Sequence, residues 1–278
     1  MKFTNNFYEN SISDAARDFI ELSKLNYHDI RDYAVQVNGI MHNPYYMNEI
    51  LNHTVELGNV SSIDLNDIAT QDNPKLKSFY RLNEERSSIR KYSGDAVNID
   101  ELSCLLKTSL FTINKEEAKD QGLKRRNIAS PGGLYPIEIY YLNLKNNHMP
   151  VGAYFYDQHN GDLKMINRGD NVNFVKQVYK AFAVDERENV DIDIKNSSGI
   201  IILGASLNRV SFKYLDRGIR WAFTEAGSVL HNLQLAGTAI ETIGTCPCAG
   251  FFDDMISDLI GFKSIDQLPV VSLVIGKI

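Results

Sequence analysis

The residues best suited to chemistry in this sequence stand together at positions 213–220. Lys213 and Tyr214 are adjacent, and Arg217 and Arg220 follow them. A phenol and an ammonium group, with ordinary pKa values of about 10 and about 10.4, are both poor bases at neutral pH. A neighbouring cation favours the phenolate, and loss of water favours the neutral amine, so either change brings one group toward general-base catalysis. Such a cluster beside a long apolar helix is unusual for a purely structural segment.

A second basic segment stands at Glu84–Ser93. It contains Arg86, Ser87, Ser88 and Arg90. Guanidinium groups and hydroxyls are donors that suit a phosphate, because they supply charge and paired hydrogen bonds. On charge alone, a solvated turn before the next predicted helix is the simpler interpretation, and phosphate binding is the alternative.

A turn rich in Gly and Pro precedes an alternating strand. It contains Ser130, Pro131, Gly132 and Gly133, and glycine allows the backbone to approach a flat or anionic ligand closely. The sequence lacks the Gly-Lys-Ser/Thr spacing of a P-loop and the Gly-x-Gly-x-x-Gly motif of dinucleotide-binding folds. A P-loop and a Rossmann site are therefore not expected.

The elements that must position these residues alternate between helices and strands. Apolar residues recur at spacings of three and four from Arg217 to Ile240, which predicts a long helix. Gly218, Ala222 and Ala226 form a row of small residues along it, which lets another helix approach closely. The pattern indicates an α+β or α/β fold, with further helices at 13–25, 99–107, 171–182 and 253–259 and strands at 137–142, 152–157, 162–166, 198–203 and 270–275.

The composition limits the class of protein. The chain has 278 residues, of which 44% are hydrophobic and 23% charged, enough for a core in one large domain or two. A formal net charge of -6 argues against sequence-independent nucleic-acid binding, which needs a basic face. We find neither a run of about 20 apolar residues nor an apolar N-terminal signal. We therefore expect a cytoplasmic protein.

The cysteines and the N-terminal region carry no recognisable catalytic pattern. Cys246 and Cys248 are separated by one residue, whereas a redox pair normally has two residues between its cysteines and a zinc site needs about four ligands. We interpret them as buried or backbone-proximal thiols and expect no metal. Residues 1–80 are expected to form a helical accessory region, and residues 81–278 the main domain.

Taken together, the motifs resemble the flavin-dependent nitroreductase family. Within it they resemble the SagB-type branch of thiazole- and oxazole-forming dehydrogenases, which includes the microcin-type azoline oxidases. The likeness covers about residues 84–276. It rests on Arg86–Arg90 (Arg-Ser-x-Arg in the family), on 129–138 (Pro-Ser-Gly-Gly-Ala-Leu-Tyr-Pro-x-Glu), on 152–156 (Gly-x-Tyr-x-Tyr), on Lys213–Arg220 (Lys-Tyr-x-x-Arg-Gly-Tyr-Arg) and on Glu225–Gly227 with Asn232.

The resemblance implies an α+β nitroreductase-like fold, with a mixed, mainly antiparallel sheet flanked by helices. It also implies FMN bound at the interface of a homodimer, with the long helix at the dimer core and its small-residue row in contact with the partner subunit. It favours the phosphate interpretation of the Arg86–Arg90 segment. The residues that match cofactor-binding positions are Arg86, Ser87, Ser88, Arg90, Ser130, Pro131, Gly132, Gly133, Asn232, Ala249 and Gly250.

The resemblance further implies a reaction. Members of the branch oxidise a thiazoline or oxazoline, formed from Cys, Ser or Thr of a precursor peptide, to the aromatic azole, with the flavin as hydride acceptor. Lys213 and Tyr214 match the catalytic pair. We expect Tyr214 to accept the proton and Lys213 to tune it, and the reverse assignment is the alternative. Arg217 and Arg220 are expected to hold the cofactor or an acidic part of the peptide, or, for Arg220 in particular, to pair with Glu225.

Two other functions remain open. One is a general NAD(P)H-dependent nitro or flavin reductase, which would not need the Lys213–Tyr214 pair. The other is an FMN-bound scaffold for a cyclodehydratase complex, with residues 1–80 as the docking region. The expected partners are a second copy of the chain, a precursor peptide and a cyclodehydratase complex.

Overall fold

The structure, a computed structural model, describes residues 12–52, 58, 60–64, 73–113, 125–145, 149–169, 171–184 and 192–278. The chain divides into two compact units, one of residues 26–84 and a larger one that combines the N-terminal segment up to Leu25 with Glu85–Ile278. The smaller unit contains α2 (Ile30–Met41), α3 (Pro44–Asn52) and α4 (Pro74–Glu85), which ends at the boundary. Its role in docking stays a prediction. Within the described residues, no helix is both long enough and apolar enough to cross a membrane.

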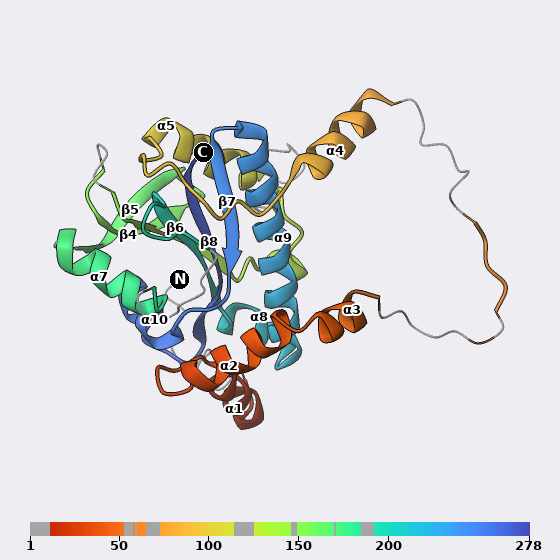
Figure 1. Ribbon diagram of the computed structural model, residues 1–278. Helices are drawn as coiled ribbons and strands as arrows, with labels where there is room; N and C mark the ends of the chain where they lie inside the picture. The colour runs from red at the N-terminus through yellow and green to blue at the C-terminus, as the bar shows by residue number, and fades with distance from the viewer. Residues whose placement is uncertain are drawn as a thin grey trace. The chain divides into compact units, whose positions relative to one another are not determined.

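A six-stranded sheet forms the centre of the larger unit (Figure 1). All of its neighbouring strands are antiparallel. The predicted α+β class and mainly antiparallel sheet are thereby confirmed. The strand order is β5 (Asp162–Arg168), β4 (Gly152–Asp157), β3 (Ile137–Asn143), β6 (Gly199–Ser206), β8 (Gln267–Lys277) and β7 (Ile243–Cys248), and a separate short ladder joins β1 (Thr112–Ile113) to β2 (Arg125–Arg126).

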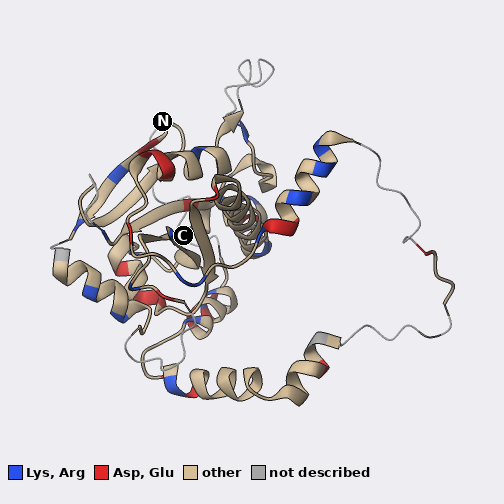
Figure 2. Ribbon diagram, turned by 45° about the horizontal axis from the view of Figure 1, so that its top comes forward, with Lys and Arg blue, Asp and Glu red and all other residues tan. Residues whose placement is uncertain are grey.

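Helices pack against both faces of this sheet, because side chains alternate between the faces along each strand. In β3, Ile137, Ile139 and Tyr141 belong to one buried cluster, whereas Tyr140 and Leu142 belong to the other. The first cluster includes residues of α5 (Ile99–Ser109) and α9 (Arg217–Ile240), and the second includes residues of α7 (Asn171–Ala181) and α10 (Asp253–Ile260). Figure 2 shows Lys and Arg interspersed with Asp and Glu over the larger unit.

The small-residue row of α9 is buried inside the chain itself. Ala222 and Ala226 are 0% and 1% exposed and pack in the core cluster between α9 and the sheet. A Cβ on Gly218 would lie 2.8 Å from the carbonyl carbon of Val210, so the start of α9 touches the backbone of α8 (Asn208–Tyr214). The expectation that this row contacts a partner subunit is therefore wrong, because the chain's own elements fill the space beside it.

Two elements were missed by the sequence patterns. Residues Asn208–Tyr214 form the separate short helix α8, where a polar start to the long helix was expected. Ile243–Cys248 forms the edge strand β7, although Pro247 lies within it. Proline is tolerated at the edge of a sheet, where one side of the strand has no ladder to complete.

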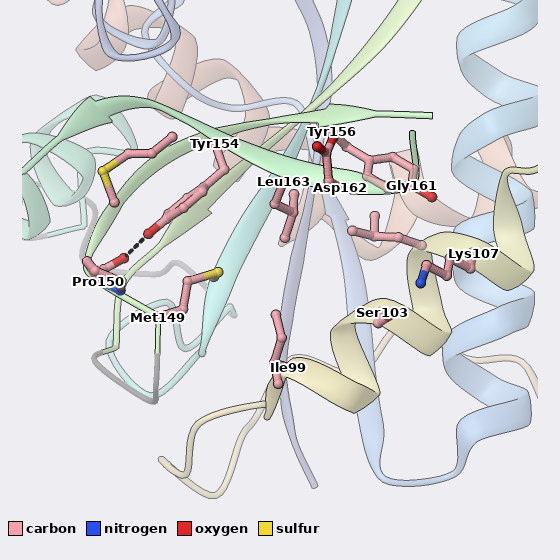
Figure 3. A pocket seen from close by; sticks show the side chains of 12 residues that line it. Ile99, Ser103, Lys107, Met149, Pro150, Tyr154, Tyr156, Gly161, Asp162 and Leu163 are labelled. Carbon is pink, nitrogen blue, oxygen red and sulfur yellow. Dashed lines mark hydrogen bonds between the residues drawn. The ribbon is translucent and has the colours of Figure 1, made fainter. Parts of the chain in front are cut away.

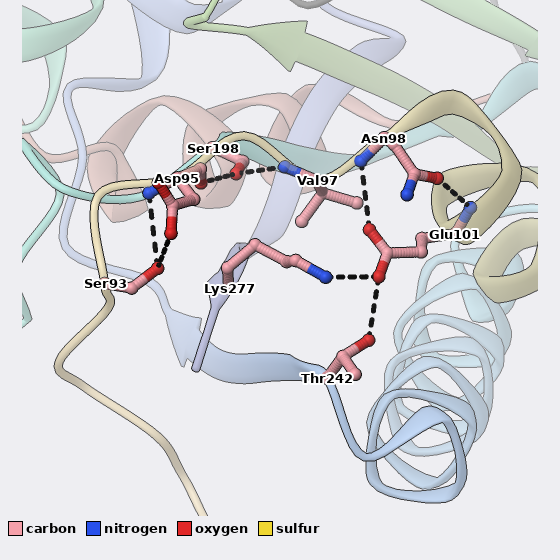
Figure 4. A network of polar contacts seen from close by, with 8 residues as sticks. All are labelled: Ser93, Asp95, Val97, Asn98, Glu101, Ser198, Thr242 and Lys277. Atoms are coloured by element: carbon pink, nitrogen blue, oxygen red, sulfur yellow. Dashed lines mark hydrogen bonds and ion pairs between the residues drawn. The ribbon is translucent and has the colours of Figure 1, made fainter.

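A polar network fixes the segment that leads from the Arg86–Arg90 region into α5 (Figure 4). Glu101 accepts a hydrogen bond from the Asn98 N–H at 3.0 Å, and the Asn98 side chain accepts one from the Glu101 N–H at 2.8 Å, which forms a capping box. The Glu101 carboxylate also binds Thr242 at 2.9 Å and pairs with Lys277. The start of α5 is therefore tied to the turn after α9 and to the end of β8.

The N-terminal helix α1 (Asp14–Ser23) is tied to α10. The Ser13 hydroxyl caps α1 by accepting from the Ala16 N–H at 3.2 Å, as the sequence predicted. At the other end, the Leu25 N–H donates to Asp253 Oδ2 at 2.9 Å, and Lys24 pairs with Asp254 at 2.9 Å. Burial raises the pKa of Asp253 to about 6.

This Asp253 contact predicts a pH-dependent stability. Because the folded state holds the Asp253 proton more tightly than the unfolded chain, whose carboxyl pKa is about 3.9, the stabilisation is complete below about pH 4 and is lost as the pH rises through about 6. Asp253→Asn should remove this dependence. The free energy of unfolding of the wild type minus that of the variant, measured with urea, should fall from pH 4 to pH 7. Asp254→Asn is the control, and parallel profiles for wild type and Asp253→Asn would contradict the prediction.

Candidate functional site

The Gly-rich turn lies against the Lys–Tyr pair, although the two motifs are far apart in the sequence. A Cβ on Gly132 would lie 2.8 Å from Lys213 Nζ and 2.9 Å from Tyr214 Oη. Gly132 and Gly133 have φ values of 62° and 67° inside the short 3-10 helix Pro131–Gly133. Only glycine adopts this conformation readily. The backbone of the turn therefore reaches both reactive groups.

Lys213 and Tyr214 end α8 and interact with one another. Lys213 Nζ lies 5.3 Å from the centroid of the Tyr214 ring. Lys213 is exposed and Tyr214 is half-buried. Leu215, which follows, has φ 51° and ψ −146°, a conformation that costs a non-glycine residue free energy and turns the chain sharply into α9. The pair thus stands at an accessible corner between two helices.

A layer of polar residues supports this turn, and most of it was not foreseen. Arg126 stacks on the ring of Tyr135 at 4.5 Å, and its N–H donates to the Tyr135 hydroxyl at 2.8 Å. Arg209 pairs with Glu138 and donates to the Tyr135 carbonyl at 3.0 Å. The available signals were the position of Arg126 just before the turn and the helical spacing of four between Arg209 and Lys213.

Glu225 of α9 belongs to the same layer. Its side chain is buried, and Oε1 accepts a hydrogen bond from the Ile137 N–H at 3.3 Å. Burial raises the pKa of Glu225, while the Ser130 hydroxyl, the Ile137 N–H and the charges of Arg126 and Arg209 act in the opposite direction. The ion pair expected between Glu225 and Arg220 is wrong, because Arg220 lies on the exposed side of α9.

The Arg86–Arg90 segment lies along the edge strand β7. The Ile89 N–H donates to the Thr245 carbonyl at 2.9 Å, and the Arg90 carbonyl accepts from the Asp193 N–H at 2.8 Å. Arg90 donates to the Ser88 carbonyl at 3.3 Å. Arg86 and Ser88 are half-buried, and Ser87 and Arg90 are exposed. Among the described residues, neither arginine forms an ion pair, so both guanidinium groups remain available for an anion.

The end of β7 adjoins this segment. Burial raises the pKa of the Cys246 thiol, and the charge of Arg90 acts in the opposite direction, so these two groups are close. The Cys248 carbonyl accepts a hydrogen bond from Ser272 at 2.6 Å. Ala249 is exposed and Gly250 half-buried directly after the strand. The described His, Cys, Asp and Glu residues form no cluster of three that would suit a metal.

The predicted site residues therefore fall into separate groups. The Ser130–Gly133 turn meets Lys213 and Tyr214, whereas Arg86–Arg90 lies beside β7 and the Ala249–Gly250 loop. Asn232, on α9, donates to the Ser109 carbonyl of α5 at 3.4 Å. That these groups bind a single FMN stays a prediction.

A cavity of about 380 Å³ lies between α5 and the β4–β5 hairpin (Figure 3). None of the predicted catalytic or cofactor-binding residues lines it. The cavity therefore belongs to a different part of the larger unit from the Lys–Tyr pair. Its wall includes Ile99, Ser103, Lys107, Tyr154, Tyr156, Leu163 and Met165.

The chain belongs to the nitroreductase family: residues 84–277 match the family model described as Nitroreductase family. This membership indicates an oxidoreductase. The chain is 25% identical over 194 residues to a Methanocaldococcus jannaschii protein named as a candidate nitroreductase, MJ1384, and the match covers 69% of this chain and 87% of that protein.

Solved structures show the same fold. A chain of the E. coli microcin synthetase McbBCD complex, solved with truncated pro-MccB17 bound, superposes with a TM-score of 0.66 at 15% identity, over 100% of this chain and 98% of that chain. A candidate nitroreductase of Ralstonia eutropha superposes with a TM-score of 0.54 at 17% identity, over 70% of this chain and 80% of that chain. At these identities the likeness is one of fold.

Proposed function

We propose that this protein is an FMN-dependent dehydrogenase that oxidises peptide thiazolines and oxazolines to thiazoles and oxazoles. The observation that carries the proposal is the meeting of Lys213 Nζ and Tyr214 Oη at the Gly132 backbone. The reaction requires removal of a proton from the former Cα, and a phenol beside an ammonium group can accept it. A simple nitroreductase has no need of such a pair. The likeness of fold to a microcin synthetase chain is compatible with this substrate class.

The residues of the chain fit FMN. The available guanidinium groups of Arg86 and Arg90, with Ser87 and Ser88, suit the phosphate, because charge-assisted paired hydrogen bonds are the strong ones. The open backbone of the Ser130–Gly133 turn suits the flat ring. In this proposal Asn232, Ala249 and Gly250 complete the site. Bound FMN would supply hydride acceptance and pass the electrons to dioxygen.

The chain's own residues would orient the azoline and move one proton. Tyr214 accepts the proton, and the Lys213 ammonium 5.3 Å from its ring stabilises the phenolate by charge. The turn at Gly132 limits the position of both groups. The low cost of reorganising a prepositioned pair is the main gain in such a site.

The proposal includes a homodimer and further partners. Arg217, Arg220 and Trp221 lie on the exposed side of α9, with Trp221 39% exposed. In a homodimer, this side would contact the partner subunit, and the Arg86–Arg90 group of one subunit would join the Lys–Tyr group of the other. Residues 1–80 would dock a cyclodehydratase complex that supplies the azoline peptide, in the cytoplasm. A general NAD(P)H-dependent nitroreductase is the second candidate, favoured by the family match.

The catalytic assignment predicts a specific loss of activity. Lys213→Ala and Tyr214→Phe should keep bound FMN, seen by its absorbance and its release on denaturation. Both should lose turnover of a thiazoline peptide by about 10²–10⁴-fold, because the proton acceptor or its charge partner is gone. Lys263→Ala, at an exposed lysine, is the control. Normal turnover in both variants would refute the assignment, and rapid flavin reduction by NADPH in stopped flow, without azoline oxidation, would favour the nitroreductase.

The turn offers a matched pair of variants. Gly132→Ala and Gly133→Ala both place a side chain at a positive φ, which costs about 1–2 kcal/mol of stability in each. Only the Gly132 variant pushes on Lys213 and Tyr214, since a Cβ on Gly133 meets nothing within 4 Å. Turnover should therefore fall by about tenfold or more in Gly132→Ala alone. Equal turnover in the two variants, compared at similar melting temperature, would contradict the geometry.

The phosphate assignment predicts weaker FMN binding. Arg90→Ala removes a charge-assisted donor worth about 1.5–3 kcal/mol, so the FMN dissociation constant should rise by about tenfold to a hundredfold. Lys91→Ala, which removes an exposed neighbouring charge, should change it little. Fluorescence titration of the apoprotein with FMN measures both constants. A rise that is the same in both variants would indicate general charge attraction and not a phosphate contact.

A further inference from the structure

Glu225 is a buried acid that no step above uses. Its side chain is 2% exposed on α9, and its Oε2 atom has no hydrogen-bond partner within the described residues. Burying a carboxyl group without full pairing is costly, so its presence calls for a structural or functional reason. The groups around it are Arg126, Arg209 and the Ser130 hydroxyl.

The carboxyl group of Glu225 contacts the chain on both sides of the Gly-rich turn. On one side it faces the Ser130 hydroxyl, and on the other it accepts the Ile137 N–H at 3.3 Å. Ile137 is itself buried, and its N–H would be left without an acceptor if the carboxyl group were absent. One side chain thus holds the start and the end of the turn.

The Ser130 contact continues to the reactive groups. Ser130 Oγ accepts the Tyr135 N–H at 2.8 Å, and the Ser130 carbonyl accepts the Gly133 N–H at 3.0 Å. These bonds set the positive-φ conformation in which Gly132 faces Lys213 Nζ and Tyr214 Oη. A shift of the turn would therefore move the wall against which the pair rests.

We infer that Glu225 is a positioning residue that fixes the Ser130–Gly133 turn against Lys213 and Tyr214 by its hydrogen bonds. The catalytic part of this inference rests on the proposed azoline oxidation, whereas the anchoring of the turn does not. Because the role is to accept and donate hydrogen bonds, glutamine can replace the carboxyl group, and an apolar residue of similar size cannot. Gln234 provides a matched comparison, as another buried polar side chain on the same helix.

The test compares Glu225→Gln, Glu225→Leu and Gln234→Leu in the full chain with FMN. With a peptide that carries one thiazoline, Glu225→Leu should lower kcat by about 10²-fold with little change in KM. Glu225→Gln should recover most of the loss, and Gln234→Leu should keep wild-type kcat. Hydrogen exchange of peptides that cover residues 130–137, read by mass spectrometry, should speed up in Glu225→Leu alone.

The two readouts separate the inference from the proposed function. A wild type that does not oxidise the thiazoline refutes the proposed function, and the exchange rates then still decide whether Glu225 anchors the turn. Wild-type kcat or unchanged exchange in Glu225→Leu would overturn the positioning role. Failure of Glu225→Gln to recover activity would also overturn it, since a hydrogen-bonding anchor tolerates that change.

Discussion

The close packing of α9 on α8 is the contact on which the candidate site depends. At Gly218 the two helices approach so closely that a Cβ would lie 2.8 Å from the Val210 carbonyl carbon and 2.9 Å from the Ser211 nitrogen. Backbone atoms cannot yield as a flexible side chain can, so the approach requires glycine. The sharp corner at Leu215 then follows, held by the Leu215 N–H bond to the Ser211 carbonyl at 2.8 Å and the Gly218 N–H bond to the Leu215 carbonyl at 2.9 Å. This corner presents Lys213 and Tyr214 to the turn.

The polar layer below the turn explains why the turn keeps one conformation. Arg209 and Glu138 form a partly buried pair, and Arg126 covers the ring of Tyr135. Such groups add little stability compared with apolar packing, yet removing one partner leaves a buried charge unpaired. Their effect is therefore on specificity of conformation: they connect β2, β3 and α8 at the point where the backbone of Gly132 meets the reactive side chains. Glu225 joins α9 to the same layer.

The separation of the predicted site into groups has a physical basis in the sheet. β7 is an edge strand, and the Arg86–Arg90 segment lies along it with the Ile89 N–H bound to Thr245. An edge strand exposes unpaired backbone groups, which a covering segment can protect. The segment thus holds its arginines at the edge of the sheet, while the Lys–Tyr pair stands at the start of α9. The proposed homodimer would unite the two groups through the exposed side of α9, and not through the buried small-residue row.

Much of the fold followed from local patterns in the sequence. The long helix, the hairpin of β4 and β5 and the buried strand β6 have strong periodicity or strong turn signals, and the fold class was confirmed. β7 and α8 were missed because their stability comes from neighbours: a proline-containing segment becomes a strand only at a sheet edge, and α8 is too short to show a helical period. The membership of residues 84–277 in the nitroreductase family agrees with the motifs that carried the resemblance.

The sequence by itself determined which residue types stand next to one another: the adjacent Lys213 and Tyr214, the Gly132–Gly133 turn and the arginines of 86–90. Only the tertiary structure decided which of these segments meet. It placed Gly132 against the Lys–Tyr pair, gave Glu225 the Ile137 N–H as a partner in place of Arg220, and filled the small-residue row of α9 from within the chain. The physical reason is that periodicity reports which face of a helix is apolar, whereas the identity of the surface that covers this face depends on packing between distant segments.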